Sequence, residues 1–264
     1  MIFFSAIEPI YYLLPLIGLL VGLFGTMLGG GGGFIFLPVL TLVLKVPAQT
    51  AVITSLVATL PVCMVGSVGH YHRSNIHFRI AALFAATGIA GAFIGAGIAN
   101  RISAAQLKDS FGIYSLIIAL NMLLGAWKKK RERKRPEKKT EKIPVKTFKG
   151  TFFGLFAGMI TGTFGTSGTA PVLAGLFSMN IPVKVVFGTS LLIVLCNTLF
   201  AVGAHFLVGQ IDLTLVGFLS TGSAIGAVTG PRLLAKIKTE CSEHRFRYGY
   251  AALMAGLGIL MIWR

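Results

Sequence analysis

The chain has 264 residues, of which 55% are apolar and only 12% are charged. A soluble domain carries about twice that charged fraction, because its surface must be compatible with water, so the composition excludes an ordinary soluble fold. The formal net charge of +16 does not indicate nucleic-acid binding, because 12 of the 24 basic residues lie in one short tract at residues 128–149.

The N-terminal sequence MIFFSAIEPIYY has no Lys or Arg before its apolar run, so it lacks the basic flank of a cleavable signal peptide. The first apolar stretch, residues 10–45, is too long for one span and is interrupted by LGGGGGF at residues 28–34. Each glycine costs a helix about 1 kcal/mol relative to alanine. We therefore predict a helix that unwinds at the glycines and returns as a second segment starting near Phe34.

Three apolar segments follow at residues 50–70, 79–100 and 110–127, each near the roughly 20 residues that a membrane-spanning helix needs. The tract at residues 128–149 then holds 12 basic and 3 acidic residues, a net charge of +9. Short basic tracts beside transmembrane helices are typical of cytoplasmic loops. We expect a cytoplasmic, solvated linker that fixes orientation; contact with anionic lipid headgroups is the alternative.

The rest of the chain resembles its beginning. Residues 150–179 form a long apolar stretch broken by GTFGTSGTAP at residues 162–171, and we predict that its second segment starts near Ala170. Three more apolar segments then cover residues 184–207, 213–235 and 246–263. All eight acidic residues lie at predicted helix ends or in loops, which leaves a cationic substrate without its usual partner inside the membrane.

An offset of 135 residues aligns the two parts. VPAQTAVITSL at residues 46–56 falls on IPVKVVFGTSL at residues 181–191, and His70 falls on His205. The same offset matches Gly30 and Gly33 with Gly165 and Gly168. Internal repeats are common in secondary transporters. The sequence thus predicts residues 1–127 as the first repeat, 128–149 as the linker and 150–264 as the second repeat.

These observations predict an all-α polytopic membrane protein with two homologous halves, each a Gly-broken hairpin plus three transmembrane helices. If each hairpin returns to its own side, the basic loops at residues 72–79 and 236–247 join the linker in the cytoplasm, as the positive-inside rule requires. The two halves are then inverted relative to each other in the membrane.

Non-helical backbone at membrane depth is tolerated where it is buried in protein or lines a wet cavity. Paired breaks therefore indicate a binding site near the midplane, where helix N-termini favour a small anion. The predicted substrate-binding residues come from the breaks and from the repeated Thr-Ser pairs: Gly30, Gly31, Gly32, Gly33, Gly165, Thr166, Ser167, Gly168, Thr169, Thr54, Ser55, Thr189 and Ser190. Glycines at four-residue spacing, Gly91, Gly95, Gly222, Gly226 and Gly230, are better explained by close helix packing.

His70 and His205 are the only repeated titratable pair; they are candidates for a proton relay or, alternatively, for interfacial hydrogen bonds. Three scattered cysteines are too few for a disulfide framework or a metal site. We expect no metal and no cofactor, and no enzyme activity, because no acidic residue lies deep enough to serve catalysis.

The Gly-rich break followed by FIFLPVL, a proline and a Thr-Ser pair, repeated as GTFGTSGTAPVL, IP and GTSL, resembles the TauE/SafE family. The resemblance implies movement of sulfite, a sulfonate or a related anion, and we expect an exporter in a bacterial-type plasma membrane. Thr166, Ser167 and Thr169 stand where the family usually has a fuller glycine run. An anion channel and a non-transporting membrane scaffold remain as alternatives.

Overall fold

The computed structural model describes residues 2–27, 29–132, 147–179, 181–206, 210–236 and 239–263. In the first half the helices are α1 (Leu14–Met27, preceded by the 3-10 helix η1, Pro9–Leu13), α2 (Gly33–Pro38, continued by the π-helix η2, Val39–Val43), α3 (Ala48–Tyr71), α4 (Phe78–Ala99) and α5 (Ala104–Glu132). In the second half they are α6 (Thr147–Phe164), α7 (Thr169–Phe177), α8 (Val183–Phe206), α9 (Leu213–Lys236) and α10 (Thr239–Trp263). Two short strands, β1 (Ile2–Phe3) and β2 (Ile211–Asp212), pair in parallel.

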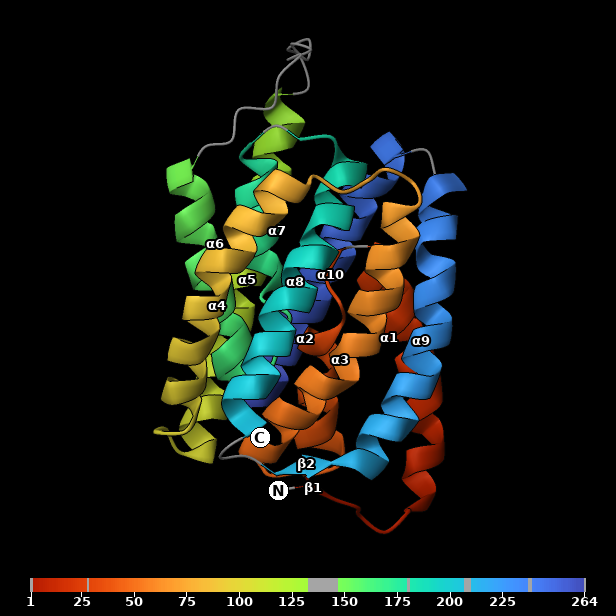
Figure 1. Cartoon of the computed structure of the whole chain (residues 1–264), viewed down its shortest axis with the longest axis vertical. Helices are drawn as coiled ribbons and strands as arrows, with labels where there is room; N and C mark the ends of the chain where they lie inside the picture. Colours follow the sequence, from red (N-terminus) through yellow and green to blue (C-terminus); the bar gives the residue numbers. More distant parts are fainter. Residues whose placement is uncertain are drawn as a thin grey trace.

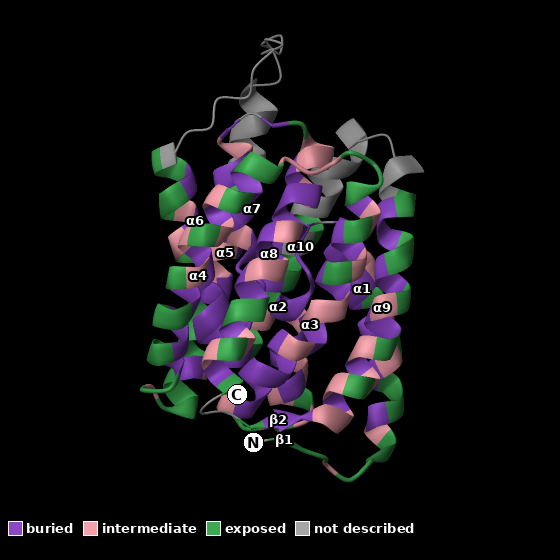
Figure 2. Cartoon of the chain, in the orientation of Figure 1, coloured by how far each residue is buried: buried purple, intermediate pink, exposed green. Residues whose placement is uncertain are grey.

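The prediction of a polytopic all-α membrane protein is confirmed. Among the described residues, six helices are long and apolar enough to cross a membrane. Many large apolar side chains are exposed, for example Ile117 at 58% and Ile259 at 52%. Exposed residues run along the outer faces of the helices (Figure 2). An exterior with many apolar side chains is a liability in water and is suited to lipid.

Each broken stretch forms a hairpin. The first hairpin, α1 and α2, begins near Ser5, whose N–H bonds Asp212, and it ends at α3, where Thr54 accepts the N–H of the same Asp212. The second hairpin, α6 and α7, begins with Gly150 against Leu83 near the start of α4 and leads into α8, where Gly188 lies against Asn75. The two hairpins therefore open toward opposite ends of the bundle (Figure 1).

The peripheral helices pack in pairs across the halves, α1 against α9 and α4 against α6, while α5 packs on α10 and α3 on α8 (Figure 1). Glycines allow the backbones of the first two pairs to touch. A Cβ atom on Gly226 of α9 would collide with the Leu19 carbonyl of α1, and one on Gly91 of α4 would collide with the Leu155 carbonyl of α6. Gly95, Gly222 and Gly230 make equivalent approaches, so the prediction of close packing by these five glycines is confirmed.

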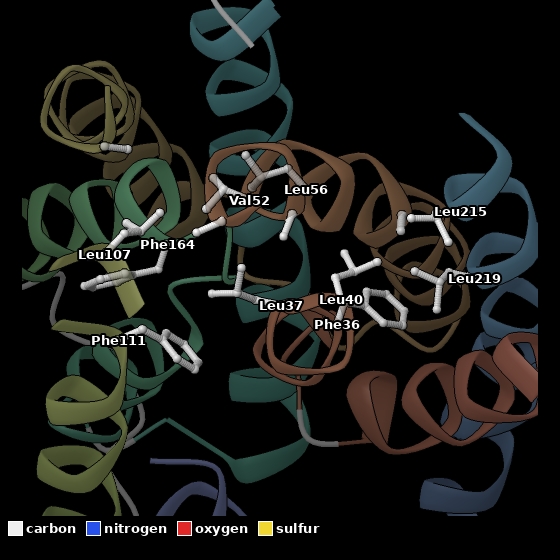
Figure 3. Packing of buried hydrophobic residues seen from close by; sticks show 14 of the residues in the cluster. Phe36, Leu37, Leu40, Val52, Leu56, Leu107, Phe111, Phe164, Leu215 and Leu219 are labelled. Atoms are coloured by element: carbon white, nitrogen blue, oxygen red, sulfur yellow. The ribbon is translucent and has the colours of Figure 1, made fainter. Parts of the chain in front are cut away.

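Segment α2 lies in the centre of the main apolar core. Leu37 and Leu40 pack among Val52 and Leu56 of α3 and Leu215 of α9 (Figure 3). Toward the second half, the same core continues through Leu107 and Phe111 of α5 and reaches Phe164 at the end of α6. These fully or almost fully buried contacts hold each hairpin tip against helices of both halves.

The structure corrects the repeat alignment at the breaks by one residue. Helix α2 starts at Gly33 and α7 at Thr169, an offset of 136, whereas α3 and α8 keep the offset of 135. The first half therefore has one additional residue between the break and the next helix. It is accommodated at the π-helix Val39–Val43, since i→i+5 bonding fits an extra residue into a helical turn. Gly29 thus corresponds to Gly165, and Gly32 corresponds to Gly168.

The helices on both sides extend into the predicted linker, residues 128–149. Helix α5 continues to Glu132 and α6 begins at Thr147. Residues 133–146, on which the prediction of contacts with anionic lipid headgroups depends, lie outside the described residues.

Candidate functional site

The two Gly-rich breaks meet in the middle of the bundle. Gly33 N donates to Ser167 Oγ at 3.1 Å, and Thr169 Oγ1 donates to the Gly30 carbonyl at 2.9 Å. A Cβ atom on Gly33 would lie 3.1 Å from both Gly165 O and Ser167 N. The structure therefore brings together residues 30–33 and 165–169. The sequence predicted all of these residues to bind substrate but did not predict which atoms are engaged.

Left-handed glycines shape both breaks in the same way. Gly29 and Gly165 have φ of 70° and 63°, and the N-cap residues of α2 and α7, Gly32 and Gly168, have φ of 89° and 54°. Other residues adopt this region at a cost. A Cβ atom on Gly168 would also collide with the Ala157 carbonyl of α6, so both the backbone conformation and the lack of space exclude a side chain at this position.

The Thr-Ser pairs connect each half to the other rather than standing free. Ser55 Oγ donates to Gly165 O at 3.0 Å, and its repeat partner Ser190 donates to Gly29 O at 2.8 Å. Thr54 Oγ1 accepts the N–H of Asp212 at 3.4 Å, and Thr189 Oγ1 accepts that of His77 at 2.9 Å. All four hydroxyl-bearing residues are 0% exposed. In this structure they hold the breaks and the interhelical loops in place.

The second break carries hydrogen-bond donors without partners. Thr166 is 2% exposed, and its Oγ1 has no partner among the described residues. Within the same part of the chain the backbone N–H groups of Thr166, Ser167 and Gly168 also have none. Consecutive N–H groups next to left-handed residues form a concavity that binds anions. The N-terminus of α7, which begins at Thr169, adds the positive end of its dipole.

The first break is better satisfied. Gly30 N donates to Gly25 O at 2.6 Å, Gly32 N to Gly30 O at 2.7 Å, and Gly33 N to Ser167 Oγ. Glycines 30 and 31 also carry no hydroxyl where the second half has Thr166 and Ser167. The second half is therefore the side of the paired breaks with more unpaired donors among the described residues.

His70 and His205 occupy equivalent places at the ends of the broken helices. His70 Nε2 lies 3.3 Å from Thr26 O at the end of α1, and His205 Nε2 lies 2.6 Å from Gly162 O near the end of α6. Each is almost fully buried, at 1% and 3% exposure. The carbonyls at a helix C-terminus lack intrahelical donors, and each imidazole satisfies one of them. This geometry matches the hydrogen-bonding alternative; the proton relay stays a hypothesis.

Among the described residues, the buried carboxylate of Asp212 is already engaged in hydrogen bonds. Asp212 is 3% exposed, and its Oδ1 accepts the N–H groups of Thr214 at 3.0 Å, Leu215 at 3.4 Å and Ser5 at 3.4 Å. It caps the start of α9. The carboxylate therefore serves the helix end, and its charge is offset by three donors.

Comparison with known proteins identifies the family. The family model described as "Sulfite exporter TauE/SafE" matches residues 14–261. The chain belongs to the TauE/SafE family. A "Probable membrane transporter protein" of Xylella fastidiosa strain Temecula1 is 28% identical over 262 residues, covering 94% of this chain and 93% of that protein.

A second relative, "Probable membrane transporter protein YdhB" of Bacillus subtilis, is 26% identical over 218 residues and covers 82% of this chain and 86% of its own length. No solved structure matches the chain. The match extends over both halves, so this TauE/SafE protein is an integral membrane protein and a membrane transporter.

Two buried polar residues were not among the predicted site residues. Asn197 and Thr198 of α8 are 0% exposed, and their side-chain polar atoms have no partner in the described part of the chain. A signal was present, because the offset of 135 pairs Thr198 with Cys63 and Asn197 with Val62, and a gain of polarity inside a transmembrane helix indicates function.

Proposed function

We propose that this protein is a secondary transporter that exports a small sulfur-containing oxyanion, such as sulfite or a sulfonate, bound at the second Gly-rich break. The observation that carries the proposal is the set of buried, unpaired donors at Thr166, Ser167 and Gly168. A buried polar group without a partner costs about 1–3 kcal/mol. Several donors together at one point are best explained by a ligand that accepts hydrogen bonds.

An anion suits these donors better than a cation or a neutral solute. Among the described residues the N–H groups of Thr166, Ser167 and Gly168 and the Thr166 hydroxyl have no partner, they lie directly before the N-terminus of α7, and Asp212 is already satisfied by three donors. A partly buried helix N-terminus stabilises a negative charge by up to about 2 kcal/mol. One such terminus and a few hydrogen bonds give a site weak enough to release its ligand, which a carrier requires.

The description "Sulfite exporter TauE/SafE" of the family supports sulfur oxyanions as substrates and export as the direction. The hairpins that open toward opposite ends, with matching left-handed glycines, support inverted repeats around the site. Because the residues of the site are buried, the anion reaches it after one hairpin moves. We propose the plasma membrane as the location, with residues 128–149 in the cytoplasm.

Reconstitution into liposomes tests this function. Vesicles preloaded with unlabelled methanesulfonate or sulfite should accumulate the labelled anion by counterflow, with saturation as its concentration rises. Protein-free liposomes and vesicles given a labelled organic cation are the controls. An anion channel would give flux that neither saturates nor shows counterflow, and a scaffold would give no flux; either result contradicts the proposal.

A further inference from the structure

One face of α8 follows the first break. Ser190 Oγ donates to Gly29 O at 2.8 Å, and one turn later Val194 Cγ1 would lie 3.3 Å from a Cβ atom on Gly31. Residues four positions apart project from the same side of a helix. The next member of this series is Thr198, so its side chain continues the row that faces the centre of the bundle.

Thr198 differs from three other buried threonines that lie within helices. Thr26, Thr59 and Thr161 each donate their hydroxyl to a carbonyl four residues earlier in their own helix, at 2.8 Å in all three cases. Thr198 is equally buried, but its hydroxyl has no partner among the described residues. The usual local solution is available to this side chain and is not used, which leaves the hydroxyl free for a ligand.

The repeat relation predicts that this hydroxyl lies beside the second break. In the first half the residue equivalent to Thr198 is Cys63, whose Sγ would lie 2.5 Å from a Cβ atom on Gly31. Under the corrected offset at the breaks, Gly31 corresponds to Ser167. The repeat therefore predicts that Thr198 lies next to Ser167 and Thr166, whose hydroxyl also has no partner in the described part of the chain.

We propose that Thr198 contacts the substrate directly, and that its hydroxyl and that of Thr166 bind different oxygens of one oxyanion. This inference rests on the proposed anion site and adds its position: the anion lies off the pseudo-two-fold axis, on the second half. The first half has Gly30, Gly31 and Cys63 at the equivalent places, which provide no hydroxyl and only a weak thiol donor. The preferred ligand thus has two or more acceptor oxygens at one end.

The neighbouring Asn197 does not belong to this row. A Cβ atom on Gly88 of α4 would lie 2.7 Å from Asn197 Nδ2, so the amide faces the α4 interface. Residues one position apart point about 100° away from each other on a helix.

Cys63 is the matched control for Thr198, because it occupies the same place in the other half.

The test measures binding of methanesulfonate to purified protein by calorimetry, with thermal unfolding as the folding control. We expect Thr198→Val to weaken binding about tenfold, the effect of one hydrogen bond to a charged group, while Thr198→Ser and Cys63→Ala stay within about twofold of the parent. If Thr198→Val binds like the parent while Thr166→Val is weakened, the anion site stands and the role of Thr198 is wrong. If the parent binds no oxyanion, the proposed function itself fails.

A second measurement covers the case in which Thr198→Val does not fold. In protein with Cys63, Cys196 and Cys241 replaced by serine, Thr198→Cys supplies a single thiol. Methanesulfonate should slow alkylation of this thiol in a concentration-dependent way. Unchanged alkylation at concentrations that saturate binding overturns the proposal.

Discussion

Asp212 donates its backbone N–H to the hydroxyl of Thr54 at 3.4 Å. His77, 135 residues before Asp212, donates its backbone N–H in the same way to Thr189, 135 residues after Thr54, at 2.9 Å. One of the two bonds ties the α8–α9 connection to α3, and the other ties the α3–α4 loop to α8. Each therefore joins the two halves at one end of the bundle. Both are closed in this structure, together with the Ser55 and Ser190 contacts to the breaks.

We predict that Thr189→Val raises the reactivity of Cys63 toward a thiol reagent in protein whose Cys196 and Cys241 are replaced by alanine. The substitution removes a hydrogen bond of about 1 kcal/mol and so favours opening at the His77 end. Cys63 is 0% exposed and lies in the half of α3 that leads to this end. Thr54→Val, which acts at the other end, is the matched control. Equal effects of the two substitutions would show that neither bond closes a particular end.

Glycine contacts between α1 and α9 give a prediction on stability. Gly226→Ala should destabilise the protein by several kcal/mol, since its Cβ would collide with the Leu19 carbonyl and backbone cannot move aside cheaply. Gly217→Ala on the same helix meets no atom within 4 Å and should be neutral or stabilising by up to about 1 kcal/mol. Thermal unfolding in detergent measures both. Equal melting temperatures for the two variants would argue against the close approach of these helices.

His205 gives a prediction that separates structure from proton transfer. Gln has an N–H donor and no titration near neutral pH, so His205→Gln should keep the bond to Gly162 O and retain transport. His205→Leu should lose about 1–3 kcal/mol of stability, because a buried carbonyl is left without its donor. Transport that disappears in His205→Gln, in protein that melts like the parent, would support the relay instead.

Membrane orientation is tested by two exposed positions near helix ends. His72 follows α3 at the end where the second hairpin opens, and Ala105 lies in the first turn of α5 at the opposite end; both are exposed. In cysteine-free protein, His72→Cys should be labelled from the cytoplasm, with the basic linker, and Ala105→Cys from outside. Labelling of both from one side would be incompatible with the proposed topology.

Most of the fold is predictable from sequence, since the apolar segments and glycine runs determine where helices form and end. The segments predicted to begin near Phe34 and Ala170 begin at Gly33 and Thr169. The one-residue shift between the breaks was not predictable, because it depends on the π-helix at Val39–Val43, and a π-turn has no distinct composition.

The candidate site was predicted less completely. Residue types nominate the Thr-Ser pairs and Ser167 as donors, but only the structure shows that their hydroxyls are engaged with backbone groups. The hydroxyls of Thr166 and Thr198 have no partner among the residues that the structure describes, and this difference arises from tertiary packing. Glycine substitutions are poor probes of the site. A Cβ atom on Gly31 would lie 2.5 Å from Cys63 Sγ, and φ at Gly31 is 63°, so a substitution there destabilises the fold whether or not it affects binding.

The most direct test of anion binding at the second break is the methanesulfonate affinity of Thr166→Val compared with Thr166→Ser. Valine has nearly the shape of threonine and lacks its hydroxyl, which is buried and unpaired in the structure. A hydrogen bond to a charged group contributes about 1.5–3 kcal/mol, so Thr166→Val should bind at least about tenfold more weakly, while Thr166→Ser should bind like the parent. Equal affinities of the parent and a correctly folded Thr166→Val would contradict the account.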